Sequence, residues 1–276
     1  MKIGFIGLGS MGYGQAMLLA KSAHDLTVYD VAAKAMAAFE GKATLAGSMA
    51  DVGKDADVVG ICVRDDKQVN ECVDALLPAM RADSILMIHS TVHPELMTEL
   101  AKRAAERNIH VLDAAVTRTI IAQDAPFVFC MTGGDEAIAA RVQSVLDAYS
   151  TDTIHVGRHG SAMALKITNN LVSWSQIIIG LEAFRMAEAA GVPTEKLLTV
   201  MKKNGCLTPP MGGFAQMRPR ATEPDMAELI RSQSGIGVKD LSLAEELGSS
   251  AGTPTPVGSF IRGIIKQTLD DMTVKH

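Results

Sequence analysis

The chain has 276 residues, long enough for two domains that each bury a hydrophobic core. Hydrophobic residues make up 47% of it and the formal net charge is −5, which argues against a disordered chain and against a general nucleic-acid binder. No apolar run reaches the roughly 18 residues of a membrane span, and no secretory leader is visible, so we expect a cytoplasmic protein with no membrane partner.

The chain opens with a short apolar run over residues 3–6 that predicts a buried strand. Gly7, Gly9 and Gly12 follow at the spacing G-x-G-x-x-G. At a strand-to-helix turn, the first glycine permits the tight turn, the second lets the backbone approach a pyrophosphate, and the third lets the helix pack on the sheet. We therefore predict a dinucleotide site at this helix N-terminus. Its turn consists of Gly7, Leu8, Gly9, Ser10, Met11 and Gly12.

A second strand-like run, residues 26–29, ends at Asp30. A carboxylate at this point can accept hydrogen bonds from both ribose hydroxyls of adenosine, and it repels a 2′-phosphate. The alternative is a plain glycine turn with Asp30 as a helix-capping residue. The strand, the turn and the helix together favour the cofactor site, and Asp30 favours NAD over NADP.

Strand-like and helix-like segments then alternate up to residue 160. Buried-strand patterns recur at 57–63, 84–88, 109–113, 127–131 and 153–156, with helical patterns at 32–39, 65–80, 94–107 and 135–149. Alternation at this density predicts an α/β domain over residues 1–160, with a Rossmann-type, doubly wound parallel sheet covered by helices.

The pattern changes after residue 160. Residues 161–190 contain one glycine and no proline, which predicts a helix of about 45 Å that joins two lobes. Further helical segments are expected at 194–203, 225–232, 241–248 and 257–270, separated by Pro/Gly-rich connections at 209–213, 235–237 and 252–256. The sequence therefore predicts an all-helical second domain over residues 161–276.

Three polar residues share one face of the long predicted helix. Lys166, Asn169 and Asn170 stand at positions i, i+3 and i+4. The surrounding helix is mostly apolar, so the lysine either extends to solvent or lines a polar pocket. The residues alone leave both possibilities open.

Four motifs follow one another along the chain. They are Gly7-Leu8-Gly9-Ser10-Met11-Gly12, Ser90-Thr91-x-x-Pro94, Gly160-(x5)-Lys166-(x2)-Asn169-Asn170 and Lys239-Asp240-Leu241-x-Leu243-Ala244. In this order they resemble the β-hydroxyacid dehydrogenase family, which includes 3-hydroxyisobutyrate and tartronate semialdehyde dehydrogenases. The resemblance implies an NAD(H)-dependent enzyme that acts on a small hydroxy acid or its semialdehyde, with its site between the two domains, in a homodimer or homotetramer.

The same resemblance implies roles for single residues. Lys166 is the catalytic general acid/base and Asn170 helps to hold the substrate. Thr91 lies near the nicotinamide, and Lys239 reaches the cofactor pocket. The loop that touches the adenosine half of the cofactor corresponds here to Val63, Arg64 and Gln68.

The chain departs from the family at residues 117–119. Thr117, Arg118 and Thr119 replace a Ser-Gly-Gly whose backbone N–H groups clasp the substrate carboxylate. Arginine offers a planar fork of donors that suits a carboxylate, sulfonate or phosphonate, and the Arg-Thr pair is similar to sulfolactaldehyde reductases of the family. We expect Arg118 to clamp the substrate anion; the alternative is a surface arginine that closes a strand end.

Two other functions share parts of this pattern. An imine reductase has this architecture but usually lacks the catalytic-type lysine, and a non-catalytic NAD(H)-binding protein keeps the glycines without needing Lys166. No metal site is expected, because the cysteines lack metal-type spacing and are interpreted as free, buried thiols. They are Cys62, Cys72, Cys130 and Cys206.

Overall fold

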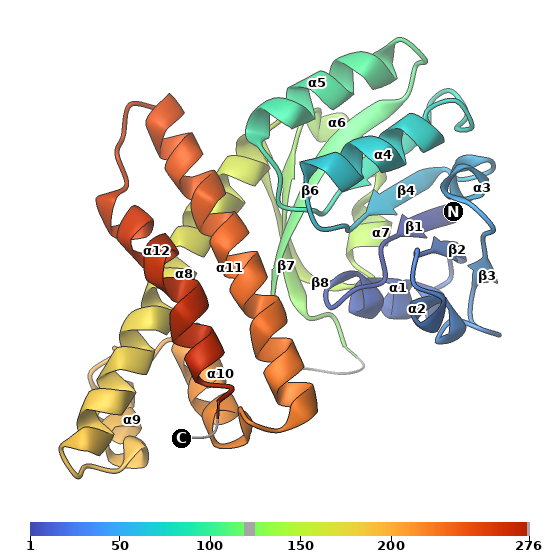
Figure 1. The fold of residues 1–276 in the computed structure, drawn as a ribbon. Helices are drawn as coiled ribbons and strands as arrows, with labels where there is room; N and C mark the ends of the chain where they lie inside the picture. Colours follow the sequence, from blue (N-terminus) through green and yellow to red (C-terminus); the bar gives the residue numbers. More distant parts are fainter. Residues whose placement is uncertain (119–124, 275–276) are drawn as a thin grey trace. The chain divides into compact units, whose positions relative to one another are not determined.

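The computed structural model describes residues 1–118 and 125–274. The chain forms two compact units, Met1–Lys166 (unit 1) and Ile167–His276 (unit 2). Unit 1 runs from blue to yellow-green in Figure 1, and unit 2 from yellow to red. The division falls at Lys166, inside the long helix, whereas the sequence-based division falls at residue 160.

Unit 1 contains an eight-stranded sheet among the described residues, in the order β3-β2-β1-β4-β5-β6-β7-β8 (Figure 1). The chain starts at β1, winds outward through β2 and β3, and then crosses to β4 on the other side of β1. This doubly wound order confirms the predicted Rossmann-type sheet. The strands are β1 (Lys2–Ile6), β2 (Asp25–Tyr29), β3 (Thr44–Leu45), β4 (Val58–Ile61), β5 (Ile85–Ile88), β6 (His110–Arg118), β7 (Val128–Gly133) and β8 (Ser150–Gly157).

One strand pair departs from the predicted parallel sheet. β6 and β7 are antiparallel, with Asp113 opposite Gly133 and Arg118 opposite Val128. A parallel connection needs a crossover of about a dozen residues, and the chain between Arg118 and Val128 is shorter than that. β6 also extends beyond the strand predicted at 109–113, so Thr117 and Arg118 belong to a strand.

Alternate strand residues supply two hydrophobic cores, one on each face of the sheet. On β5, Ile85 and Met87 belong to the first core, and Leu86 and Ile88 to the second. Burial on both faces explains why the strands are continuous apolar runs. The first core is covered by α1 (Gly12–Ala20), α2 (Ala33–Ala37), α6 (Glu136–Arg141) and α7 (Gln143–Leu146). The second is covered by α3 (Met49–Gly53), α4 (Asp66–Leu76), α5 (Pro94–Ala105) and the start of α8 (Ser161–Ala189).

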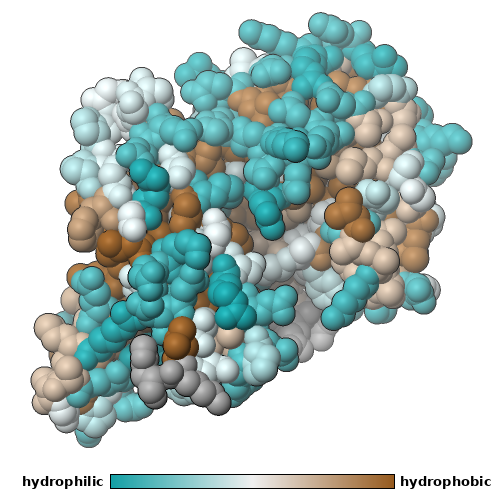
Figure 2. Space-filling view, in the orientation of Figure 1, coloured by the Kyte–Doolittle hydropathy of each residue, from teal (hydrophilic) through white to brown (hydrophobic). Residues whose placement is uncertain are grey.

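The solvent faces of α4 and α5 are polar. Helix α4 buries Val69, Cys72, Val73 and Leu76, and its remaining faces carry charged and amide side chains. Figure 2 shows hydrophilic side chains over the region of α4 and α5. The single helix predicted at 135–149 is interrupted at Val142, which lies between α6 and α7.

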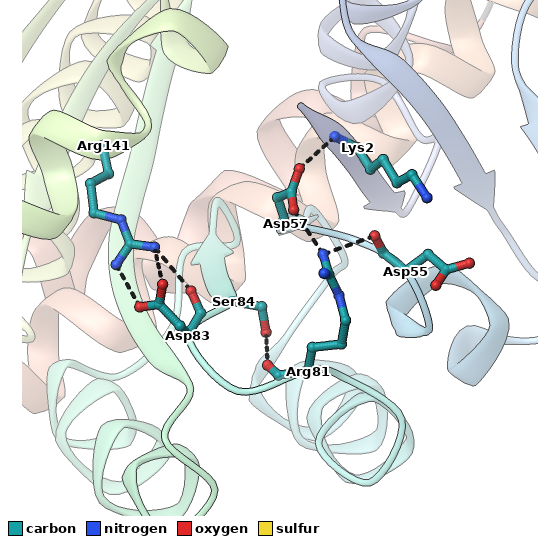
Figure 3. A network of polar contacts seen from close by, with 7 residues as sticks. All are labelled: Lys2, Asp55, Asp57, Arg81, Asp83, Ser84 and Arg141. Carbon is teal, nitrogen blue, oxygen red and sulfur yellow. Dashed lines mark hydrogen bonds and ion pairs between the residues drawn. The ribbon is translucent and has the colours of Figure 1, made fainter.

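A polar network ties together the amino-terminal ends of three strands (Figure 3). Asp57, just before β4, accepts a hydrogen bond from the backbone N–H of Lys2 at 2.8 Å and pairs with Arg81 at 2.8 Å. Asp83, just before β5, pairs with Arg141 at 2.9 Å. These groups lie at the opposite ends of the strands from the glycine turn, so we assign them to stability.

The regular secondary structure in the described residues of unit 2 is all helical. Its core contains Trp174, Phe184, Ile230, Leu241 and Ile265. In the described parts of the chain, no helix is both long enough and apolar enough to cross a membrane. Besides the rest of α8, its helices are α9 (Thr194–Lys203), α10 (Pro209–Met217), the 3₁₀ turn Arg218–Arg220, α11 (Pro224–Ser250) and α12 (Pro256–Asp271).

Two predicted connections of unit 2 are helical instead. Residues 209–213 begin α10, because proline is well suited to the first turn of a helix. Residues 235–237 lie inside α11, so the helices predicted at 225–232 and 241–248 are one helix. Glycine in a helix interior costs only about 1 kcal/mol, and the buried face of α11 on either side of Gly235 and Gly237 outweighs it.

Candidate active site

The three glycines of the first turn meet different surroundings. Gly7 has a φ of +95°, and a side chain on it would collide with the carbonyl oxygen of Cys62. A side chain on Gly12 would collide with the carbonyl oxygen of Gly7. At Gly9, by contrast, no atom lies within 4 Å of an added Cβ. The fold therefore requires the first and third glycines, whereas the space at the second is available to a ligand.

Asp30 closes the glycine turn from the end of β2. Its Oδ2 accepts a hydrogen bond from the backbone N–H of Leu8 at 2.6 Å, and its Oδ1 accepts one from Ala32 at 2.8 Å. The first of these bonds was not foreseen from the sequence. Each carboxylate oxygen has a further lone pair, so the carboxylate is still able to accept hydrogen bonds from ribose hydroxyls.

The loop after β4 is held by side-chain hydrogen bonds. The backbone N–H of Val63 donates to Ser90 Oγ at 2.8 Å, and that of Arg64 donates to Gln68 Oε1 at 3.0 Å. Asp65 caps α4 by accepting from the Gln68 backbone at 3.0 Å. Val63, Arg64 and Gln68 are thus brought together, and Gln68 has the additional task of shaping the loop.

Arg118 lies at the exposed end of β6 and reaches the glycine turn. Its guanidinium lies over the ring of Phe127, 5.4 Å from the ring centre, and Nη2 is 3.7 Å from Met11 Sδ. These weak contacts orient the guanidinium and leave its N–H groups able to bind an anion. Its neighbour Thr117 is half-buried. Thr119 lies outside the described residues.

Lys166 and Asn170 are buried on α8, one turn apart. Lys166 is only 9% exposed and Asn170 is also buried. Lysine is among the residues least often found buried, because its ammonium group loses hydration. This favours the second of the two possibilities that the sequence left open, a lysine in a polar pocket.

Asp240, on α11, is the centre of a buried polar cluster in unit 2. The residue is 2% exposed, and its Oδ2 accepts hydrogen bonds from Asn170 Nδ2 at 2.7 Å and from Trp174 Nε1 at 3.2 Å. Its Oδ1 pairs with Lys239 Nζ at 2.9 Å. Since the Asn170 nitrogen is engaged, its carbonyl oxygen is the hydrogen-bond acceptor that this side chain offers to a ligand.

Both halves of the chain match known dehydrogenase domains. Residues 2–157 match the NAD-binding domain of 6-phosphogluconate dehydrogenase, and residues 160–275 match a domain described as the NAD-binding domain of NADP-dependent 3-hydroxyisobutyrate dehydrogenase. The chain belongs to the β-hydroxyacid dehydrogenase family. It is therefore an NAD(P)-binding oxidoreductase of the type that acts on CH–OH groups.

Relatives of this β-hydroxyacid dehydrogenase span nearly its whole length. An uncharacterized oxidoreductase of Mycobacterium tuberculosis is 32% identical over 94% of this chain and 90% of the relative. The mitochondrial 3-hydroxyisobutyrate dehydrogenase of Drosophila melanogaster is 26% identical over 97% and 84%. A solved 3-hydroxyisobutyrate dehydrogenase of Mycobacterium tuberculosis with L-serine superposes with a TM-score of 0.79 at 26% identity, covering 99% of this chain and 94% of that one.

The His, Cys, Asp and Glu side chains of the described residues were the candidates for a metal site. Among residues 1–118 and 125–274, no cluster of three or more His, Cys, Asp or Glu side chains could hold a metal ion. The four cysteines are free, but Cys206 is exposed, which corrects the expectation of buried thiols at this position. Cys206 lies on the loop after α9, where no apolar run surrounds it.

Sequence reasoning missed Asp240 and Phe127 as organisers of the site. Asp240 belongs to the quoted motif, but no role was assigned to it. The sequence carries only a weak signal for Asp240, a carboxylate directly before the apolar residues Leu241, Leu243 and Ala244, where burial would require a partner. For Phe127 the sequence carries no signal, since its contact with Arg118 depends on the antiparallel pairing of β6 and β7.

Proposed function

We propose that this dehydrogenase transfers a hydride reversibly between NAD(H) and a small β-hydroxy acid or its semialdehyde, with Lys166 as general acid/base. The burial of Lys166 on α8, one turn before an Asn170 side chain oriented by Asp240, is the observation that supports the proposal most directly. An amine in such surroundings is suited to proton transfer rather than to surface solvation.

The proposed chemistry needs one proton to move with each hydride. The nicotinamide, when bound, accepts or supplies the hydride. Lys166 takes the proton from the carbinol oxygen during oxidation and returns it during reduction. In its protonated form it also polarises the substrate carbonyl. Asn170 accepts a hydrogen bond from the substrate through its carbonyl oxygen.

The substrate's anionic group is assigned to the end of β6. Arg118 supplies the charge and the donor pair, and Thr117 and Thr119 flank it. The position of Arg118 beside Met11 supports this role, because Met11 belongs to the glycine turn. A carboxylate, a sulfonate or a phosphonate would fit the same donors.

The cofactor is proposed to be NAD(H) rather than NADP(H). The open space at Gly9 fits the pyrophosphate, and Asp30 fits the ribose hydroxyls. Val31, next to Asp30, is 82% exposed and offers no cation to a 2′-phosphate. The adenosine half is assigned to Val63, Arg64 and Gln68, and the nicotinamide half to Thr91 and Lys239.

The decisive variant is Lys166→Ala. Turnover should fall by about 100-fold or more, because proton transfer by a positioned side chain contributes at least that much. The Kd for NADH, measured by fluorescence titration, should change by less than about 2-fold. Lys196→Ala, on α9, is the matched control and should keep full activity. Substantial turnover in Lys166→Ala would contradict the proposed acid/base role.

A substrate panel tests the anion assignment. It comprises C3 and C4 hydroxy acids, semialdehydes and sulfonated analogues with NAD and NADP, together with cyclic imines and NADPH for an imine reductase. Arg118→Ala should raise KM for anionic substrates by about 10-fold or more, since a charge-assisted pair is lost. Arg107→Ala, on the surface after α5, is the control. An unchanged KM in Arg118→Ala would remove Arg118 from the substrate site.

We further propose a homodimer or homotetramer. An exposed apolar stripe on α8 supports it, because Val172, Ile179 and Met186 recur every seven residues and so share one helix face. Light scattering coupled to size-exclusion chromatography should give a multiple of the chain mass. Ile179→Glu should lower that mass, and an unchanged mass would exclude the stripe from the interface.

A further inference from the structure

The helix that carries Lys166 begins without a capping side chain of its own. Helix α8 starts at Ser161, its first turn contains no acidic residue, and the preceding Gly160 has a φ of +86° and no side chain. The first N–H groups of a helix lack partners within the helix, and this end carries a partial positive charge. The N–H group of Ser161 donates to the Arg158 carbonyl oxygen at 3.0 Å. The N–H groups that follow it need an acceptor from another segment.

Asp113, on β6, supplies that acceptor. Its side chain is fully buried, and Oδ2 accepts a hydrogen bond from the backbone N–H of Gly160 at 2.8 Å. The backbone N–H groups of Ala162 and Met163 also interact with this carboxyl and lower its pKa. A carboxylate from the sheet thus caps α8 from outside the helix, where its charge interacts favourably with the helix dipole.

The surrounding backbone is shaped to leave room for this carboxylate. A side chain on Gly133, opposite Asp113 on β7, would lie 2.8 Å from Oδ2 and 3.0 Å from the Arg158 carbonyl oxygen. A side chain on Gly160 would lie 2.6 Å from the Pro94 carbonyl oxygen. Gly133 therefore leaves room for the Asp113 carboxylate, and Gly160 lets the start of α8 pack closely against the start of α5.

Burying the Asp113 carboxylate is unfavourable by itself. Burial raises the pKa of this carboxyl to about 6, against the opposing effects of the Gly160 hydrogen bond and of the charge of His159. His159 is the titratable side chain facing it from the segment before α8, and its Nε2 contacts the Val111 carbonyl oxygen at 2.9 Å. Oδ1 has no hydrogen-bond partner among the residues that the structure describes. Perturbed, incompletely paired carboxyls of this kind are enriched at functional sites.

We propose that Asp113 is a positioning residue for Lys166, which holds the first turn of α8 against β6 and so fixes the rotation and axial position of the helix at the lysine. The inference rests on the proposed function. Lys166 follows Gly160 by six residues, which corresponds to about 9 Å along a rigid helix. Loss of the anchor lets the first turn shift, and a displacement of about 1 Å at a catalytic group is enough to cost 100-fold in rate.

The test compares Asp113→Asn with Asp57→Asn. Asp57 also accepts a backbone N–H bond at 2.8 Å, but at the opposite end of the sheet. In Asp113→Asn, kcat should fall about 10- to 100-fold, with the KM for NADH within about 2-fold of wild type. Hydrogen exchange of the amides of residues 161–166 should accelerate. Asp57→Asn should leave kcat, the KM for NADH and the hydrogen exchange of residues 161–166 unchanged.

The pH profile supplies a readout that a purely structural role would not move. Because the carboxyl must be ionised to act as the cap, wild-type kcat should decline as the pH falls through about 6. The pH profile of Asp113→Asn should not show this decline. Gly133→Ala is the second variant. It keeps the charge but displaces the carboxylate, so it should also lower kcat and accelerate exchange in the first turn of α8.

The outcomes separate this inference from the proposed function. Normal kcat and unchanged exchange in Asp113→Asn, or in Gly133→Ala if the first variant does not fold, would overturn the role of Asp113. If the wild type turns over no hydroxy acid or semialdehyde, the proposed function fails. The exchange of residues 161–166, together with acylation of the Lys166 amine followed by mass spectrometry, then decides whether Asp113 anchors that segment.

Discussion

At the scale of single residues, Gly9 separates the requirements of the fold from those of the cofactor. No atom lies within 4 Å of an added Cβ, so Gly9→Ala should fold with a Tm within a few degrees of wild type. The methyl group occupies the space assigned to the pyrophosphate, so the Kd for NADH should rise by 10-fold or more, which corresponds to about 1.4 kcal/mol. Gly12→Ala, in contrast, should lose stability as well, because its side chain collides with the backbone of Gly7.

Fluorescence titration with NADH and thermal unfolding of both variants provide the check. A Gly9→Ala variant that binds NADH as tightly as wild type would show that the phosphates do not rest on this turn. A Gly9→Ala variant that fails to fold would show instead that the turn is more tightly packed than its geometry indicates.

Asp30 has two tasks that a pair of variants can distinguish. Asp30→Ala removes both the repulsion of a 2′-phosphate and the acceptor for the Leu8 N–H group. The ratio of kcat/KM for NADP to that for NAD should rise by about 10-fold, and the free energy of unfolding should fall by about 1 kcal/mol. Asp30→Asn keeps an acceptor without the charge, so it should change the ratio more than the stability. If the ratio of kcat/KM for NADP to that for NAD is unchanged in both variants, Asp30 does not contact the 2′-hydroxyl of the adenosine ribose.

At the scale of elements, α11 contains two glycines at which substitution by alanine should have opposite effects on stability. Gly235 is exposed with open space around it, so Gly235→Ala should stabilise unit 2 by about 0.5–1 kcal/mol through the lower entropy of the unfolded chain. At Gly237 an added Cβ would lie 2.5 Å from Ile265 Cδ1 and 3.2 Å from the ring of Trp174, both in the core. Gly237→Ala should therefore destabilise by about 1 kcal/mol or more.

Urea unfolding followed by tryptophan fluorescence measures both effects, because Trp174 is the single tryptophan of the chain and lies in the core of unit 2. Equal stabilisation by both substitutions would mean that α12 does not approach α11 at Gly237. Destabilisation by both substitutions would indicate that residues 235–237 form a connection, as the sequence predicted, and not part of a continuous helix.

The elements also show where sequence reasoning succeeds and where it stops. Strands such as β4 and β5 are continuous apolar runs, and α8 is a long segment without proline, so local pattern identifies them. The continuity of α11 depends on what packs against Gly237, and the direction of β7 depends on its pairing with β6, which no local pattern contains. The same limit applies to the site. Lys166 and Asn170 were predicted from the family resemblance. The hydrogen bonds from Asn170 to Asp240 and from Gly160 to Asp113 join segments far apart in the sequence, so no local pattern predicts them.

At the scale of the whole molecule, two buried groups of unit 1 give opposite pH dependences that nearly cancel. Burial lowers the pKa of His89 from 6.5 to about 4, against the hydrogen bond to the Ala114 carbonyl oxygen. Between these values the unfolded chain binds the proton and the folded chain does not, so the free energy of unfolding falls as the pH decreases. Burial raises the pKa of Asp113 from 3.8 to about 6, so over nearly the same window the folded chain binds the proton and the free energy of unfolding rises.

Each effect amounts to about 3 kcal/mol, since one pKa unit corresponds to about 1.4 kcal/mol. These two groups together should therefore leave the stability of the wild type nearly constant between pH 6.5 and pH 4. The variants should separate them: His89→Asn, which keeps a donor for Ala114, should gain stability as the pH falls, whereas Asp113→Asn should lose it. Urea unfolding of the full chain at several pH values, followed by circular dichroism, measures how the free energy of unfolding of each variant changes with pH. Parallel slopes in the two variants would show that other groups control the acid response, because only opposite slopes identify His89 and Asp113 as its source.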